Sequence, residues 1–121
     1  MPSLYVTVES CAPDGDAWRV QWLIANYGNT PLMLTSAWVP HGRFRGADGR
    51  VALHSVLVPG AQHGLSLRVR ANEPPGTVVE NAFLVLQATG WRIFTRMRIE
   101  FNAAGEPRPL VEATTYQSIE S

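Results

Sequence analysis

The chain has 121 residues, of which 45% are hydrophobic and 17% charged, and its ten basic residues balance ten acidic ones. A chain of this length forms one domain that buries roughly two-thirds of its unfolded surface, so it needs no disulfide or metal to fold. The composition excludes a disordered chain, and no uncharged apolar run approaches the ~20 residues that a bilayer requires. Because the net charge is zero, we expect neither nucleic acid nor membrane lipid as a partner.

Cysteine usage and the N-terminus bear on the compartment. Cys11 is the one cysteine, so an internal disulfide is impossible. The first residues, Met1-Pro2-Ser3-Leu4-Tyr5, do not form a basic segment followed by an apolar run. We therefore expect no secretory signal and predict a cytoplasmic protein.

Short stretches of alternating apolar and polar residues, separated by Gly, Pro, Asn and Asp, predict an all-β fold. No window carries helical spacing of apolar residues without a Pro or Gly inside it. Residues 41–50 are expected to form a polar loop with a turn at Asp48-Gly49. The sequence predicts an antiparallel, immunoglobulin-like β-sandwich of seven to eight strands. Strands are expected at residues 4–8, 18–26, 32–39, 51–58, 65–70, 78–89 and 91–101.

The segment 78–101 gives the most specific expectation. Residues 78–89 are apolar on both faces, as in a central strand, and residues 91–101 alternate. A two-residue turn at Thr89-Gly90 places cross-strand partners on matching faces. The core face then receives the pairs Ala88/Trp91, Leu86/Ile93, Leu84/Thr95 and Ala82/Met97, and the outer face receives Gln87/Arg92, Val85/Phe94 and Phe83/Arg96.

The outer face of this hairpin is a candidate interaction surface. Phe83, Val85 and Phe94 should point away from the core, bracketed by Arg92 and Arg96. Adjacent apolar side chains rimmed by arginine have the composition of an interface centre. We predict a non-enzymatic module that binds a protein partner, or a second copy of itself as a homo-oligomer, through this face.

The C-terminal segment 107–121 follows the sandwich domain of residues 1–106. Thr114-Thr115-Tyr116 is a poor helix former, so the segment is either an extra edge strand or an extended arm. An arm that folded back would cover the outer face of the hairpin with Leu110 or Tyr116. The sequence leaves both possibilities open.

Two short motifs carry a resemblance to a known family. Asn26-Tyr27-Gly28-Asn29-Thr30-Pro31-Leu32 follows a strand, and Val58-Pro59-Gly60 precedes Leu65-Ser66-Leu67-Arg68-Val69. Residues 3–102 resemble bacterial immunoglobulin-like and fibronectin-type-III-like modules, in which Asn-x-Gly closes the second strand and Pro-Gly precedes the fifth. The resemblance implies a seven-strand sandwich with a binding or spacer role.

No arrangement in the sequence supports catalysis. Cys11 has no His or Asn near it, and there is no Gly-x-Ser-x-Gly motif. Ser55 follows His54, but neighbours on one strand point to opposite faces and do not pair as nucleophile and base. We predict that the protein is not an enzyme and has no cofactor.

The candidate metal ligands lack the close spacing of a metal site, so none is predicted. They are His41, His54, His63, Asp14, Asp16 and Asp48. Asp14-Gly15-Asp16 is similar to the start of a calcium loop, but the later ligands are missing. Turns that use Asp side chains explain these residues more simply.

An alternative function depends on the loop around residues 38–45. Trp38 is a flat aromatic at a strand end, and the following loop is basic, aromatic and flexible. Such a surface fits a carbohydrate or an acidic small molecule. Its candidate ligand-binding residues are Trp38, His41, Arg43, Phe44 and Arg45.

Overall fold

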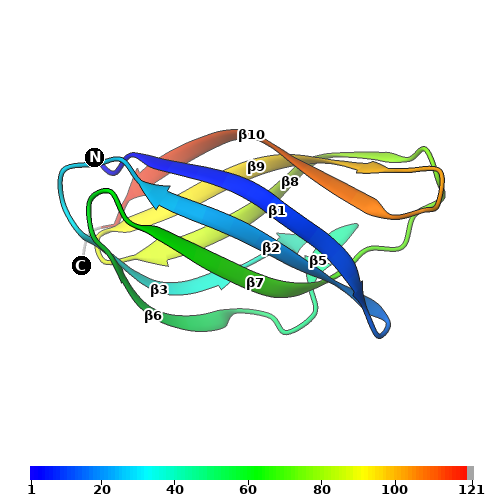
Figure 1. The fold of residues 1–121 in the computed structure, drawn as a ribbon, viewed down its shortest axis with the longest axis horizontal. Coiled ribbons are helices and arrows are strands. Elements are labelled where there is room, and N and C mark those ends of the chain that lie inside the picture. The colour runs from blue at the N-terminus through cyan, green and yellow to red at the C-terminus, as the bar shows by residue number, and fades with distance from the viewer. Residues whose placement is uncertain (120–121) are drawn as a thin grey trace.

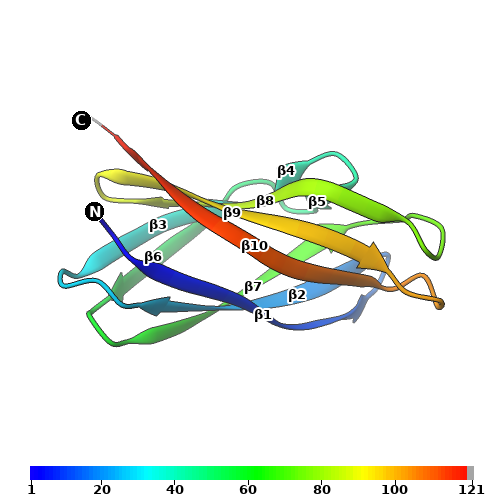
Figure 2. The same cartoon turned by 90° about the horizontal axis from the view of Figure 1, so that it is seen from above.

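The computed structural model describes residues 1–119, which form ten strands in two antiparallel sheets (Figures 1 and 2). Sheet A contains, in spatial order, β1 (Leu4–Asp14), β2 (Ala17–Asn26), β7 (Gln62–Arg70), β5 (Phe44–Gly46) and β4 (Pro40–His41). Sheet B contains β10 (Pro107–Ser118), β9 (Trp91–Phe101), β8 (Val78–Ala88), β3 (Leu32–Trp38) and β6 (Val51–Leu57). The all-β, two-sheet prediction is confirmed. The number of strands, ten, exceeds the seven to eight expected.

The β8–β9 hairpin has the predicted register. Leu86 lies opposite Ile93, Val85 opposite Phe94, and the remaining pairs follow as expected from Ala88 to Ala82. The turn residue Gly90 has a φ of +83°, which is the left-handed region that glycine tolerates best. β8 lies between β9 and β3, so it is a central strand of sheet B, as its sequence predicted.

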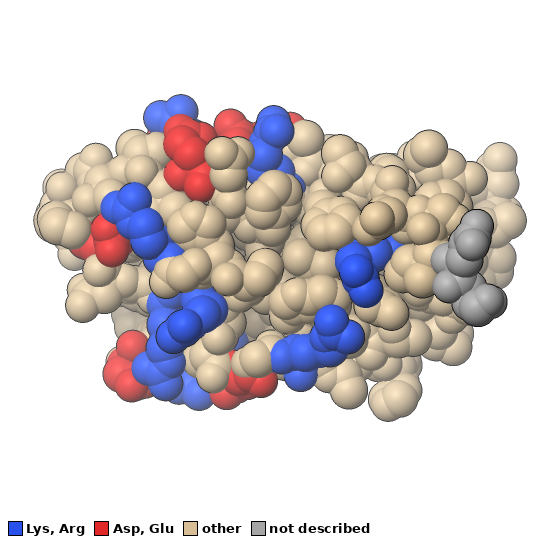
Figure 3. Space-filling view, turned by 180° about the vertical axis from the view of Figure 1, so that it is seen from behind, with Lys and Arg blue, Asp and Glu red and all other residues tan. Residues whose placement is uncertain are grey.

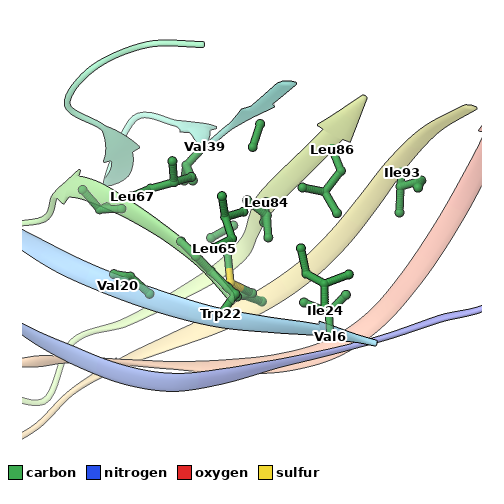
Figure 4. Packing of buried hydrophobic residues seen from close by; sticks show 14 of the residues in the cluster. Val6, Val20, Trp22, Ile24, Val39, Leu65, Leu67, Leu84, Leu86 and Ile93 are labelled. Atoms are coloured by element: carbon green, nitrogen blue, oxygen red, sulfur yellow. The ribbon is translucent and has the colours of Figure 1, made fainter. Parts of the chain in front are cut away.

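The core lies between the two sheets and is built from alternate residues of the long strands (Figure 4). Val20, Trp22 and Ile24 of β2 are fully buried. They pack in one cluster with the inward residues of β8 and β9, including Leu84, Leu86 and Ile93. Residues 1–119 form no helix long and apolar enough to cross a membrane.

A β-bulge explains why the first strand is longer than the sequence suggests, and a second bulge interrupts the last strand. β1 continues to Asp14, whereas the prediction ended at residue 8, because the register shifts between Val8 and Ser10. An extra residue in a strand reverses the side of every later side chain, so the alternation is lost. β10 carries a similar shift between Val111 and Ala113.

β10 is an edge strand that continues sheet B beyond β9. Its inward residues Pro107 and Pro109 are buried, and an edge strand tolerates their missing N–H groups. At the other end of β10, the Tyr116 hydroxyl accepts the Leu4 N–H at 2.8 Å. This bond joins β10 to β1, so the edges of the two sheets lie beside each other (Figure 2).

The predicted loop 41–50 contains part of sheet A. β4 pairs with β5, and β5 pairs with β7, so the chain passes from sheet B to sheet A after Trp38. Val39, at the crossing, is 2% exposed and belongs to the core. The two added strands have only two and three residues, too short for any alternation to show in the sequence.

Candidate interaction surface

The outer face of sheet B presents the side chains that were predicted to point away from the core. The ladders place Phe94 opposite Val85, and Phe83 opposite Arg96, on that face. The rings of Phe83 and Phe94 lie edge to face, with centroids 6.4 Å apart and planes at 89°. Both rings are half-buried. We call Phe83, Val85, Arg92, Phe94 and Arg96 the hairpin face.

Val85 was predicted to contribute to the interaction surface, but only 3% of it is exposed. It points to the outer side, but its ladder partners are Trp38 on one side and Phe94 on the other. Two aromatic neighbours are large enough to cover a valine between them. Val85 therefore supports the aromatic side chains and offers almost no area to a partner.

Trp38 belongs to this outer face because β3 lies beside β8. The Arg50 guanidinium carbon lies 3.9 Å from the centroid of the Trp38 ring, which is cation–π geometry. The contact of Arg50 with Trp38 was not predicted from the sequence. The only signal was the position of Arg50 just before β6, and contact with Trp38 depends on the pairing of β3 with β6.

The charges on the outer face of sheet B divide into two parts. Away from the hairpin tip, Arg96 lies 3.6 Å from Glu112 and Arg98 lies 3.2 Å from Glu100. Nearer the tip, Arg92 bonds the Gln87 side-chain oxygen at 3.4 Å and has no carboxylate partner among residues 1–119. Figure 3 looks onto this face. Arginines are visible in both halves of the picture, whereas the acidic side chains gather in its left half.

Residues 107–119 of the C-terminal segment do not lie across the hairpin face, and residues 120–121 of the predicted segment lie outside the described range. β10 pairs with β9 along its whole length, from Pro107 opposite Phe101 to Ser118 opposite Trp91. Tyr116 points inward to the seam with β1, and Leu110, 47% exposed, stays on β10 itself. No segment of residues 1–119 packs over Phe83 and Phe94 as a cover.

The 38–45 loop does not form one surface. Phe44 was expected in an exposed loop, but it is fully buried in the core, because β5 places it on the inner side of sheet A. Arg43 forms an ion pair with Glu73, and its N–H bonds the His41 Nδ1 at 3.0 Å. Arg45 stays exposed on β5. A ligand site at this loop remains a prediction, without a contact that favours it.

Ser55 lies beside His63, a contact that was not predicted from the sequence. Its Oγ lies 3.3 Å from Nε2 of His63, and the bond joins β6 of sheet B to β7 of sheet A. The His63 ring makes no other hydrogen bond within residues 1–119, so no second group orients it as a general base. Cys11 is half-buried, and burial, with a smaller effect of Glu106, raises the pKa of its thiol to about 11. Reactive cysteines need the opposite shift.

The acidic turn at 14–16 is held by arginines. Arg19 donates to Asp14 at 2.8 Å, and Arg70 donates to Asp16 at 2.9 Å. The hydrogen bond and charge of Arg70 lower the pKa of Asp16. Arg68 lies within 3.6 Å of both aspartates. No group of three or more His, Cys, Asp or Glu side chains in the described range is placed to hold a metal ion.

Comparison with known proteins gives no relative from which a function follows. No protein-family model matches the sequence, and no curated protein matches it. Among solved structures, the chain is similar to the thioester domain of the Enterococcus faecium TIE86 protein, with 12% identity and a TM-score of 0.33. The match covers 96% of this chain and 39% of that structure. We draw no argument about this protein from that likeness.

Proposed function

We propose that this protein is a non-enzymatic interaction module. It binds a second copy of itself, or another protein, through the hairpin face. One observation carries the proposal. β10 extends sheet B beside β9 instead of crossing it, so the half-buried rings of Phe83 and Phe94 keep part of their surface accessible to a partner. Aromatic side chains and arginine are the residues that dominate binding energy in protein interfaces.

We also propose that the sandwich is of the immunoglobulin type. Of its seven long sandwich strands before β10, the first, second and fifth (β1, β2 and β7) share sheet A. The third, sixth and seventh (β3, β8 and β9) share sheet B. The fourth, β6, lies beside β3 in sheet B. The separation of the first, second and fifth strands from the third, sixth and seventh is the one found in immunoglobulin-like sandwiches; their constant type places the fourth strand in the other sheet, and their variable type adds strands beside the third. Modules of that class usually serve in binding or spacing.

The charge of the face indicates what its partner offers. Arg92 lies near the hairpin tip and Arg50 lies over Trp38, and neither has a carboxylate partner among the described residues. A carboxylate from a partner would make a charge-assisted hydrogen bond with either guanidinium. Such rim charges act mainly on the association rate and on its salt dependence. The proposed complex should therefore weaken as ionic strength rises.

Sedimentation velocity over a range of protein concentrations tests the proposal. We expect the wild type to associate and Phe94→Glu to remain a monomer, because the variant places a charge at the centre of the face. Tyr27→Glu is the matched control, since Tyr27 is an exposed aromatic residue outside the hairpin face. It should associate as the wild type does.

The proposal fails if wild type and Phe94→Glu are both monomers of equal thermal stability. In that case the hairpin face is neither an interface nor a packing surface. An Arg92→Gln variant adds a second readout, because it should reduce the salt dependence of association without unfolding the protein. Arg92 makes only a long bond to Gln87.

A further inference from the structure

Two exposed tyrosines lie together at the end of sheet A where the chain begins. Tyr5 is 60% exposed and Tyr27 is 67% exposed. Their ring centroids are 6.3 Å apart and their planes are tilted by 55°. We call Tyr5 and Tyr27 the tyrosine pair. It lies outside the hairpin face, and the proposed function does not use it.

A buried asparagine holds the turn that carries Tyr27. Asn26 is 2% exposed, and its side-chain nitrogen donates to the carbonyls of Leu57 at 2.7 Å and Thr30 at 3.0 Å. Its side-chain oxygen accepts the Gly28 N–H at 2.8 Å. A Cβ on Gly28 would lie 3.1 Å from that oxygen, so the tight turn favours glycine.

The backbone of the turn is also tied to the strand that carries Tyr5. The Tyr27 N–H donates to the Ser3 carbonyl at 2.8 Å. Tyr5 itself lies in the ladder between β1 and β2, opposite Ala25. The backbone that carries both rings is therefore held by hydrogen bonds, and an aromatic side chain with two χ angles loses little entropy on binding.

The surface beside the tyrosine pair carries little charge, with the exposed Glu9 in the bulge of β1 at its border. In the half of sheet A nearest Tyr5, the outward positions of β1, β2 and β7 hold Thr7, Gln21, Leu23, Ala25, Gln62 and Gly64. A Cβ added to Gly64 would meet nothing within 4 Å, so no side chain covers the outer surface of β7 at this position. In Figure 1 these three strands face the viewer. The charged cluster of Arg19, Arg68 and Arg70 occupies the opposite half of the face.

We propose that the tyrosine pair binds a neutral carbohydrate. The electron-rich faces of the aromatic rings attract the C–H groups of a sugar ring. The amides of Gln21 and Gln62 and the hydroxyl of Thr7 offer both donors and acceptors to sugar hydroxyls. An anionic ligand would find no cation among the six outward residues of this half and would lie near the Glu9 carboxylate, so the surface favours a neutral glycan over an anionic one.

Titration with neutral oligosaccharides tests the proposal. The probes are cello-, xylo-, manno- and malto-oligosaccharides, each followed by amide NMR shifts and by calorimetry. We expect saturable binding of at least one probe, with shifts centred on Tyr5 and Tyr27. Tyr5→Ala and Tyr27→Ala should each bind about tenfold more weakly, as for the loss of one aromatic contact. Tyr27→Phe keeps the ring and should bind within about threefold of wild type.

The control variant is Leu110→Ala, which removes an exposed apolar side chain from sheet B and should bind as wild type. Thermal unfolding of every variant separates a binding loss from a folding loss. Absence of any shift with all four probes overturns the proposal. So does unchanged affinity in both Tyr→Ala variants. If the wild type bound no glycan and Tyr5→Ala changed the oligomeric state, the tyrosine pair would be a protein contact instead.

Discussion

Asn26 offers a sharp test of how the sequence fixes one end of the sandwich. Its side chain makes three hydrogen bonds, to the Gly28 N–H and to the carbonyls of Thr30 and Leu57. Asn26→Ala removes all three and leaves the buried Leu57 carbonyl without that donor. At about 1 kcal/mol for each bond, the variant should lose about 3 kcal/mol of unfolding free energy.

Urea unfolding followed by tryptophan fluorescence measures this loss, provided that the slope with denaturant is unchanged. Asn29→Ala is the matched control, because Asn29 is exposed in the same turn and should change stability by less than about 0.5 kcal/mol. Asn26→Asp keeps the acceptor for Gly28 but faces two carbonyls with a carboxylate, so it should be at least as destabilising as Ala at neutral pH. A loss below about 0.5 kcal/mol in Asn26→Ala would refute the role assigned to this side chain.

Three further predictions concern single residues. Burial raises the pKa of Cys11 to about 11, so at pH 8 iodoacetamide should alkylate the folded protein about two orders of magnitude more slowly than the urea-unfolded chain; equal rates would contradict the burial. The pKa of Asp16 is lowered by Arg70, so the folded state gains from this pair above the ordinary Asp pKa and loses that gain as the pH falls through the lowered one. The stability difference between wild type and Asp16→Asn should therefore shrink on acidification, and a difference that grew would have the wrong sign. Gly90→Ala forces alanine to a φ of +83° and should cost about 1 kcal/mol, whereas Gly42→Ala, with open space around its Cβ, should be close to neutral in the same thermal melts.

The β8–β9 hairpin was predictable because two independent signals agree. Glycine at position 90 fixes the turn, and the alternation of residues 91–101 fixes which side faces the core. A slip of one residue would expose Ile93 and Met97, which are fully buried. The core positions of β2 were predictable for the same reason.

The parts that the sequence did not reveal depend on contacts between distant segments. Val85 is covered because β3 brings Trp38 beside it, 47 positions away in the chain. Phe44 is buried by a three-residue strand set among polar residues, where no period exists to read. The bulge after Val8 interrupts the alternation of β1.

The contacts around the tyrosine pair could not be predicted from the sequence either. The Asn26-x-Gly28 motif indicated where a strand closes, and the structure adds that Asn26 bonds the Leu57 carbonyl from another sheet. The approach of Tyr27 to Tyr5 follows from the pairing of β1 with β2. Neither contact leaves a local pattern in the chain.

The most direct test of the central claim is a dilution series of amide NMR spectra on the wild-type protein. Binding through the hairpin face predicts concentration-dependent shifts that cluster at Phe83, Arg92, Phe94 and Arg96 and disappear in Phe94→Glu. Spectra that do not change with concentration would contradict self-association through this face. Shifts that cluster on the strands of sheet A would contradict it equally, because they would place the contact on the opposite side of the sandwich.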